Sequence, residues 1–385
     1  MNEDKGTRYQ RLKRRVGVLT LAWSVLFLAG VMASGVSNAL RELAAGAAPS
    51  GPEAVHVPLV AAIYVVLLMG LHEACGLPLA FYGGYVLERR YGLSNEPLRV
   101  WLWDQVKSLA IRVPLAVVAA GVVYAFIGRS AGGWWLPSGA AFAVLVVGLA
   151  NLGPVLLLPL FYSVKPLERE SLRRRLITLA ERAGARVLGA YEWGLAEKTK
   201  KANAALAGLG STRRILVSDT MLAEYSEDEI EVVLAHELAH YVHNDIWKGL
   251  VLESALILGG FYVAARLLEW SVPVFELAGP ADPAGLPILL LGAGAVSLVT
   301  LPVARALSRA YERSADMFAL KLTNNPAAFV SAMRRLAVQN LAEDQPSKIV
   351  EWLFYSHPPI RERIGAAQAF NALKPRGDAE GRRFR

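Results

Sequence analysis

The sequence contains a single cysteine, Cys75, which lies inside an apolar segment. One cysteine excludes an internal disulfide framework and any metal site built from several thiolates. Histidine is also scarce, with six in 385 residues, and charged residues make up only 19% of the chain. So low a charge content is unusual for a soluble protein. It points to long uncharged segments.

Apolar residues form 54% of the chain and gather in runs long enough to cross a bilayer. We therefore expect a mainly α-helical, polytopic membrane protein with six spans. The runs cover approximately residues 16–39, 57–82, 109–127, 136–161, 249–267 and 286–307. Pro154 and Pro159 predict a kink or an exit from the membrane at the end of the fourth span. The first run is too long for the apolar core of a signal peptide, so we expect a retained anchor.

Polar segments between and after these runs predict the domain organisation. We expect an N-terminal membrane domain with about four spans at 1–162, followed by a polar domain outside the bilayer at 163–248. Two further spans lie within 249–307, and a second part of the polar domain follows at 308–374. Residues 375–385 are predicted to form a disordered basic tail. Within the polar domain, residues 167–183 have a helical pattern that Gly184 ends. Residues 202–209 and 214–218 are predicted strands, joined by a turn with Gly208, Gly210 and Ser211.

Basic residues define the expected orientation. They gather before the first span, after the second and in the central polar domain, whereas the loops after the first and fifth spans are more acidic than basic. By the positive-inside rule, the polar domain and both termini face the cytoplasm. The net charge of +8 follows from these flanking residues. No basic groove interleaved with aromatic residues is present, so we expect no nucleic-acid partner.

Residues 236–240 read His-Glu-Leu-Ala-His. On a helix, His236 and His240 lie about one turn apart on the same face and can hold one metal ion. Glu237 stands beside them, where it can take a proton from water. Ser226 and Glu229 form a capping box ahead of this segment, which supports a helix. A chance match of a short motif on a helix is the alternative.

A catalytic zinc ion needs three protein ligands and one open position. His243 lies a further turn along the helix, too far to share one tetrahedral ion with the other two histidines. Ile246 occupies the position at which a metzincin has its third histidine. Glu312 and Asp316 share a helix face, so one could bind the metal while the other orients a ligating histidine. Ordinary Glu–Arg pairing on an amphipathic helix is the alternative for these carboxylates.

The pentapeptide at 236–240, together with Glu-Arg-Ser-Ala-Asp at 312–316, resembles the integral-membrane gluzincins of the type I CAAX prenyl protease family. The same clan includes the HtpX-type bacterial membrane proteases. The stretches at 81–88, 198–204, 208–214 and 356–360 resemble the CAAX branch more closely. The resemblance covers nearly the whole chain, and the order of the three motifs (His-Glu-Leu-Ala-His, Glu-x-x-x-Asp and His-Pro-Pro) makes it specific.

This resemblance implies one zinc ion per chain, with His236, His240 and Glu312 as its ligands. Glu237 would be the general base. Asp316 would orient a ligating histidine. The implied fold is a helical barrel around a large intramembrane chamber, capped by a gluzincin-type α+β catalytic domain. Eukaryotic members have seven spans, against the six counted here.

The resemblance also implies residues that contact the substrate. His357 would hydrogen-bond the oxyanion of the tetrahedral intermediate, and Arg363 would orient such groups. Asn203 and Ala204 would lie on an edge strand that pairs with an extended peptide.

The predicted activity is zinc-dependent cleavage of peptide bonds near the C-terminus of protein substrates, with or without a lipid modification, at the bilayer. One alternative is quality-control cleavage of membrane proteins of the HtpX type. Another is a transporter or channel whose zinc site is only structural. His72 and Glu73, within the second span, are expected to face a hydrated interior. Gly76 stands where a second metal motif would need histidine.

Overall fold

The computed structural model describes residues 4–130, 132–208 and 213–373. The predicted turn residues Gly210 and Ser211, and the predicted tail at 375–385, lie outside the described residues. The chain forms two compact units. We call residues 11–157 and 247–301 the helical unit, and residues 1–10, 158–246 and 302–385 the mixed unit.

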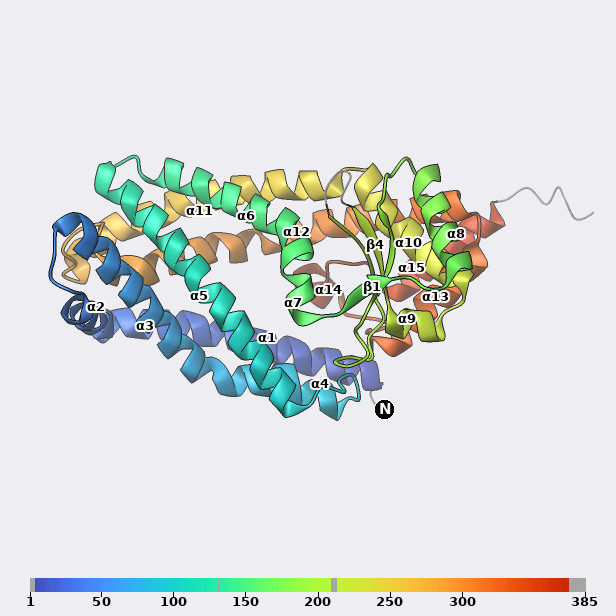
Figure 1. Cartoon of the computed structure of the whole chain (residues 1–385), viewed down its shortest axis with the longest axis horizontal. Helices are drawn as coiled ribbons and strands as arrows, with labels where there is room; N and C mark the ends of the chain where they lie inside the picture. The colour runs from blue at the N-terminus through green and yellow to red at the C-terminus, as the bar shows by residue number, and fades with distance from the viewer. Residues whose placement is uncertain (1–3, 131, 209–212, 374–385) are drawn as a thin grey trace, which may run out of the picture. The chain divides into compact units, whose positions relative to one another are not determined.

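In the described part of the chain, six helices are long and apolar enough to cross a membrane, as predicted (Figure 1). They are α1 (Lys5–Ala33), α3 (Glu53–Phe81), α5 (Leu98–Arg129), α6 (Trp135–Leu156), α11 (Asp245–Val274) and α12 (Leu286–Thr323). The shorter helices are α2 (Val36–Ala47), the π-helix η1 (Tyr82–Val86), α4 (Leu87–Arg90), α7 (Leu158–Phe161) and the 3₁₀ turn η3 (Pro283–Gly285). The break between α6 and α7 falls at Leu157, between the two prolines that predict it.

His72 and Glu73 of α3 each pair with a polar side chain of another helix. His72 Nε2 lies 3.0 Å from Ser24 Oγ, and the Glu73 carboxylate accepts two hydrogen bonds from Arg112, at 2.9 and 3.3 Å. Pairing of this kind offsets the cost of placing ionisable groups in apolar helices. An apolar cavity of about 460 Å³ lies among α3, α5, α6, α11 and α12.

The mixed unit contains a four-stranded sheet with the order β1-β2-β4-β3. Strands β1 (Val164–Pro166) and β2 (Gly189–Trp193) are antiparallel, β2 and β4 (Arg214–Ser218) are parallel, and β3 (Ala204–Ala207) runs antiparallel to β4. The observed β4 has the predicted bounds, whereas β3 is shorter than predicted. The sequence patterns did not predict β1 or β2.

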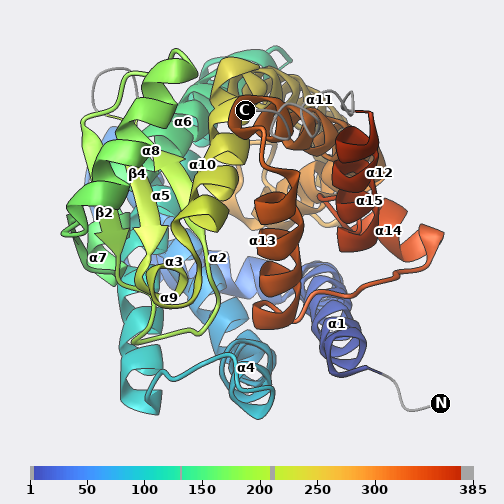
Figure 2. The ribbon, with the colours of Figure 1, turned by 90° about the vertical axis from the view of Figure 1, so that its right-hand side faces the viewer.

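The helices of this unit include α8 (Glu170–Arg182), α9 (Asp219–Glu224), α10 (Glu227–Val242), α13 (Pro326–Gln339), α14 (Lys348–Phe354) and α15 (Ile360–Ala372). Helices α8, α9 and α10 contact the sheet of the mixed unit, and further helices pack beyond them. Helix α8 ends before Gly184, which has φ +74°, as the sequence predicts. Helix α10 lies between the sheet and α13 (Figure 2). Its Ile230, Leu234 and Leu238 are fully buried in the core of this unit, so α10 is held on both sides and gives its remaining polar side chains a fixed position.

Candidate metal centre

Helix α10 begins at the predicted capping box. The Glu229 N–H donates to Ser226 Oγ (3.3 Å), and the Ser226 N–H donates to Glu229 Oε2 (2.8 Å). The other oxygen of Glu229 accepts hydrogen bonds from Ser331 Oγ and Arg335 Nε of α13, at 2.5 and 2.9 Å. Burial raises the pKa of Glu229, but these hydrogen bonds and the Arg335 charge outweigh it and hold the pKa below its usual value. The start of α10 is therefore tied to α13 by a charged carboxylate.

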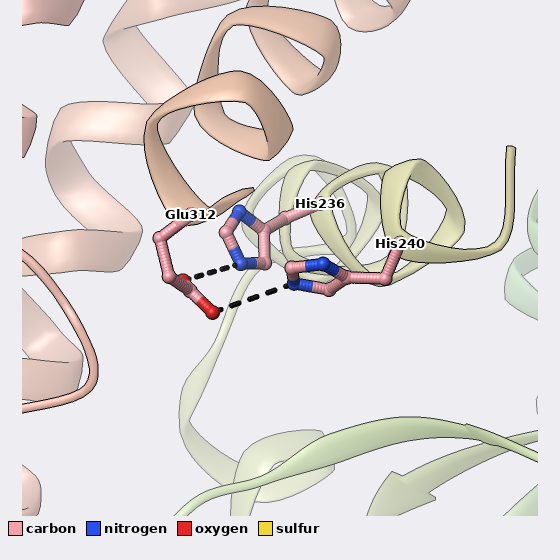
Figure 3. Close-up of side chains that lie close together, drawn as sticks. All are labelled: His236, His240 and Glu312. Carbon is pink, nitrogen blue, oxygen red and sulfur yellow. Dashed lines mark ion pairs between the residues drawn. The ribbon is translucent and has the colours of Figure 1, made fainter. Parts of the chain in front are cut away.

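His236 and His240 of α10 point toward Glu312 of α12 (Figure 3). The His236 Nε2 atom lies 3.1 Å from Glu312 Oε2, and His240 Nε2 lies 3.5 Å from Glu312 Oε1. One ligand atom from each of the three residues lies within 4.8 Å of the others. The structure thus brings together the three residues that the resemblance implies as ligands.

These three side chains fit a zinc ion. Zinc with nitrogen and oxygen ligands at about 2.1 Å has tetrahedral ligand separations of about 3.4 Å, close to the two distances observed between Glu312 and the histidines. Glu312 Oε2 is buried and, among the described atoms, lacks a hydrogen bond of good geometry. A buried carboxylate oxygen without a donor is costly unless a cation satisfies it. The donor set of two imidazoles and one carboxylate is typical of catalytic zinc sites.

Each histidine has a carboxylate beside its Nδ1 atom. Asp316 Oδ1 lies 2.9 Å from His236 Nδ1, and Arg363 of α15 donates two hydrogen bonds to Asp316, at 2.6 and 2.8 Å. Asp245 Oδ2 lies 3.1 Å from His240 Nδ1. Hydrogen bonds at Nδ1 leave the two Nε2 atoms to face the metal position. The sequence patterns did not predict that Asp245 lies beside His240, although an acidic residue soon after the motif was a visible signal.

The pKa values of His236 and Glu237 are both raised, but for different reasons. Burial alone would lower the pKa of His236, but the neighbouring carboxylates of Asp316 and Glu312 raise the pKa to about 9. Burial raises the pKa of Glu237 above its ordinary value. A carboxyl group with a raised pKa is better matched to taking and returning a proton near neutral pH.

The remaining predicted site residues lie around one cavity of the mixed unit. It has a volume of about 140 Å³ and is lined in part by Asn203, Ala204, Glu237, His357 and Arg363. His357 is exposed, and its Nε2 lies 3.2 Å from Glu312 Oε1. The guanidinium of Arg363 is buried against Asp316, so it reaches this cavity as a fixed positive charge.

His243 is not part of the cluster. It follows the last turn of α10, and its Nδ1 lies 3.4 Å from Ser314 Oγ. Its position agrees with the helix geometry that argued against it as a ligand.

The apolar spanning helices and the two-histidine, one-glutamate cluster define a membrane metalloprotease. The chain belongs to peptidase family M48, whose model matches residues 166–371. Residues 3–163 match a model described as CAAX prenyl protease N-terminal, five membrane helices. In the described part of those residues, four helices are long and apolar enough to span. The family predicted from the motifs is thus confirmed.

Individual proteins agree with this assignment. The chain is 31% identical to the uncharacterized metalloprotease YhfN of Bacillus subtilis over 364 residues, which is 94% of this chain and 83% of that protein. It is 27% identical to CAAX prenyl protease 1 of Saccharomyces cerevisiae over 79% of this chain and 71% of that protein. The fold resembles the crystal structure of S. mikatae Ste24p, with a TM-score of 0.83, 21% identity and coverage of 94% of this chain and 88% of that one.

Proposed function

We propose that this protein is a zinc-dependent endopeptidase that cleaves near the C-terminus of membrane-associated substrates, with its mixed unit in the cytoplasm. The observation that carries the proposal is the position of Glu237. It lies beside a ligand set that fits zinc, and on the same cavity as the edge strand β3. A structural zinc site needs neither an open position nor an adjacent base, so this arrangement argues against a channel or transporter. Relatives named CAAX prenyl protease favour C-terminal processing over quality control.

His236, His240 and Glu312 would hold the ion, which when bound would polarise the scissile carbonyl and acidify a water molecule. Glu237 accepts the proton of the attacking water and passes it to the leaving amine. The exposed His357 ring can donate a hydrogen bond to the oxyanion that develops on the carbonyl. Asp316 and Asp245 hold the two ligating imidazoles in place throughout.

The test is cleavage of a prenylated peptide, and of the same peptide without the lipid, by the purified full-length protein. We expect cleavage that a chelator abolishes and zinc restores. Glu237→Gln should remove cleavage and leave bound zinc nearly unchanged, because Glu237 is not a ligand. Preference for the prenylated peptide supports CAAX-type processing, whereas equal cleavage of both supports quality control. Normal turnover by the Glu237 variant would overturn the proposed mechanism.

A further inference from the structure

Strand β3 has a strand neighbour on one side only within the described part of the chain. The Ser218 N–H of β4 donates to the Asn203 carbonyl (2.9 Å), so Asn203 turns its backbone groups toward β4. In an antiparallel pair, opposed residues alternate between bonded and non-bonded positions. Ala205 therefore also faces β4, while Ala204 and Leu206 direct their N–H and C=O groups to the other side. That outer side is the edge open to an incoming peptide strand.

Ala202 has the same phase as Ala204, and both of its backbone groups are already bonded. The Ala202 N–H donates to Asn340 Oδ1 (3.1 Å), and Asn340 Nδ2 donates to the Ala202 carbonyl (3.3 Å). One carboxamide thus makes the pair of hydrogen bonds that the backbone of a neighbouring strand would make. The outer edge is closed at Ala202 and available at Ala204 and Leu206.

Asn340 is held firmly where it is. It is the C-cap of α13, with its N–H directed at the carbonyls of Leu336 and Val338. The preceding side chain, Gln339, donates to the Lys200 carbonyl (2.9 Å). At the residue that follows Asn340, Gln10 donates to the Leu341 carbonyl (2.9 Å). A carboxamide fixed in this way is not displaced by a peptide without loss of these contacts.

Asn340 also lines the cavity that contains Glu237 and His357. The closed end of the edge therefore lies at the cleavage site and not at a remote part of the sheet. Ala202 is two residues from Ala204, or about 7 Å along an extended strand. A peptide residue opposite Ala204 can be followed by about one further residue, opposite Asn203, before the next position meets the Asn340 carboxamide.

We propose that Asn340 is the end stop of the peptide-binding edge and limits how many residues can follow the cleaved bond. This inference rests on the proposed function and on a substrate that runs antiparallel to β3, because that direction sends the short segment after the cleaved bond toward Ala202. Asn340 acts on the reaction through peptide position, so it is a specificity-determining residue and makes no contact with the reacting atoms.

The test uses quenched fluorescent peptides that share one cleavage site and differ only in the length of the C-terminal segment beyond it. For the unaltered protein, kcat/KM should fall by about tenfold or more once that segment exceeds the available edge. Asn340→Ala should reduce this discrimination to nearly none, with the cleaved bond mapped by mass spectrometry. Asn340→Asp, which keeps the acceptor for the Ala202 N–H, should retain most of it.

Gln339→Ala is the matched control. It removes the neighbouring hydrogen bond to Lys200, while the backbone hydrogen bonds of Asn340 and the contact of Gln10 with Leu341 remain and keep the edge closed. Its ratio of long-peptide to short-peptide kcat/KM should equal that of the unaltered protein. If Asn340→Ala lowers both rates by one factor, as a loosened strand would, the end-stop role is refuted. Absence of metal-dependent cleavage of any peptide by the unaltered protein would instead overturn the proposed function, and this inference with it.

Discussion

Replacing Asp316 by asparagine is expected to weaken zinc binding by about 10- to 100-fold, the usual effect of losing a carboxylate that orients a ligating histidine. Asp316 does two things at once in this structure. It lies 2.9 Å from His236 Nδ1 and accepts two hydrogen bonds from Arg363. Asparagine keeps the shape and one acceptor oxygen but loses the charge.

The free-energy cost of this substitution depends on the burial of Asp316 and Arg363. Asp316 and Arg363 are 4% and 8% exposed, so the guanidinium cannot turn to water when its partner becomes neutral. Removing one member of a buried pair costs about 3–5 kcal/mol, and asparagine should fall at the low end because it still accepts a hydrogen bond. The expected loss of zinc affinity corresponds to about 1.4–2.7 kcal/mol, so the ligands should still bind zinc at high concentration.

Zinc affinity is measured by competition with a chromophoric chelator, and folding by thermal unfolding of the detergent-solubilised protein. Glu362→Gln is a suitable control, since Glu362 belongs to the same helix as Arg363 and forms an exposed ion pair with Arg313. Such a pair contributes about 0–1 kcal/mol, and its loss should leave zinc affinity unchanged. A folded Asp316→Asn protein with unaltered zinc affinity would refute the orienting role.

Three other outcomes are expected. Glu312→Ala should leave only the two histidines as ligands, so metal analysis should find well below one zinc ion per chain. Full occupancy would point to a different third ligand. Asp245→Asn should weaken zinc affinity by up to about tenfold, less than Asp316→Asn, since His240 is more exposed than His236; an effect larger than that of Asp316→Asn would contradict this ranking. Glu229→Gln should destabilise the protein by about 1–2 kcal/mol at neutral pH. The pKa of Glu229 is held below its usual value, so its contribution is complete above about pH 4.3 and is lost as the pH falls through the folded-state value. The difference in unfolding temperature between the two proteins should therefore shrink in acid, and a constant difference would count against the charged tie to α13.

The sequence predicts the local parts of the site well. The spacing of His236 and His240 is fixed by the helical repeat, and the capping box marks where that helix begins. The position of Asp245 could not be predicted in this way, because Asn244, with φ 57°, ends the helical path and turns the chain. Beyond that residue, helical periodicity no longer predicts which way a side chain points.

Strands β1 and β2 and the contact of Asn340 were not predicted because they depend on pairing between distant parts of the chain. Strand β1 has three residues, one of them Pro166, and β2 is defined by its partners in the sheet rather than by an alternating pattern. The membrane helices were predictable because their apolar length alone identifies them. Asn340 looks in the sequence like an ordinary residue at the end of a helix, and only the folded chain shows that it meets Ala202.

The contacts of helix α13 restrict where residues can be inserted into or deleted from the chain. Ser331 and Arg335 of α13 contact Glu229 at the start of α10, and at the end of α13 Asn340 contacts Ala202, just before β3. Inserting or deleting one residue between these points would turn the carboxamide by about 100° and shift it by about 1.5 Å. We therefore expect related chains to vary in length after this helix, within 341–347, and to keep the interval between Arg335 and Asn340 constant.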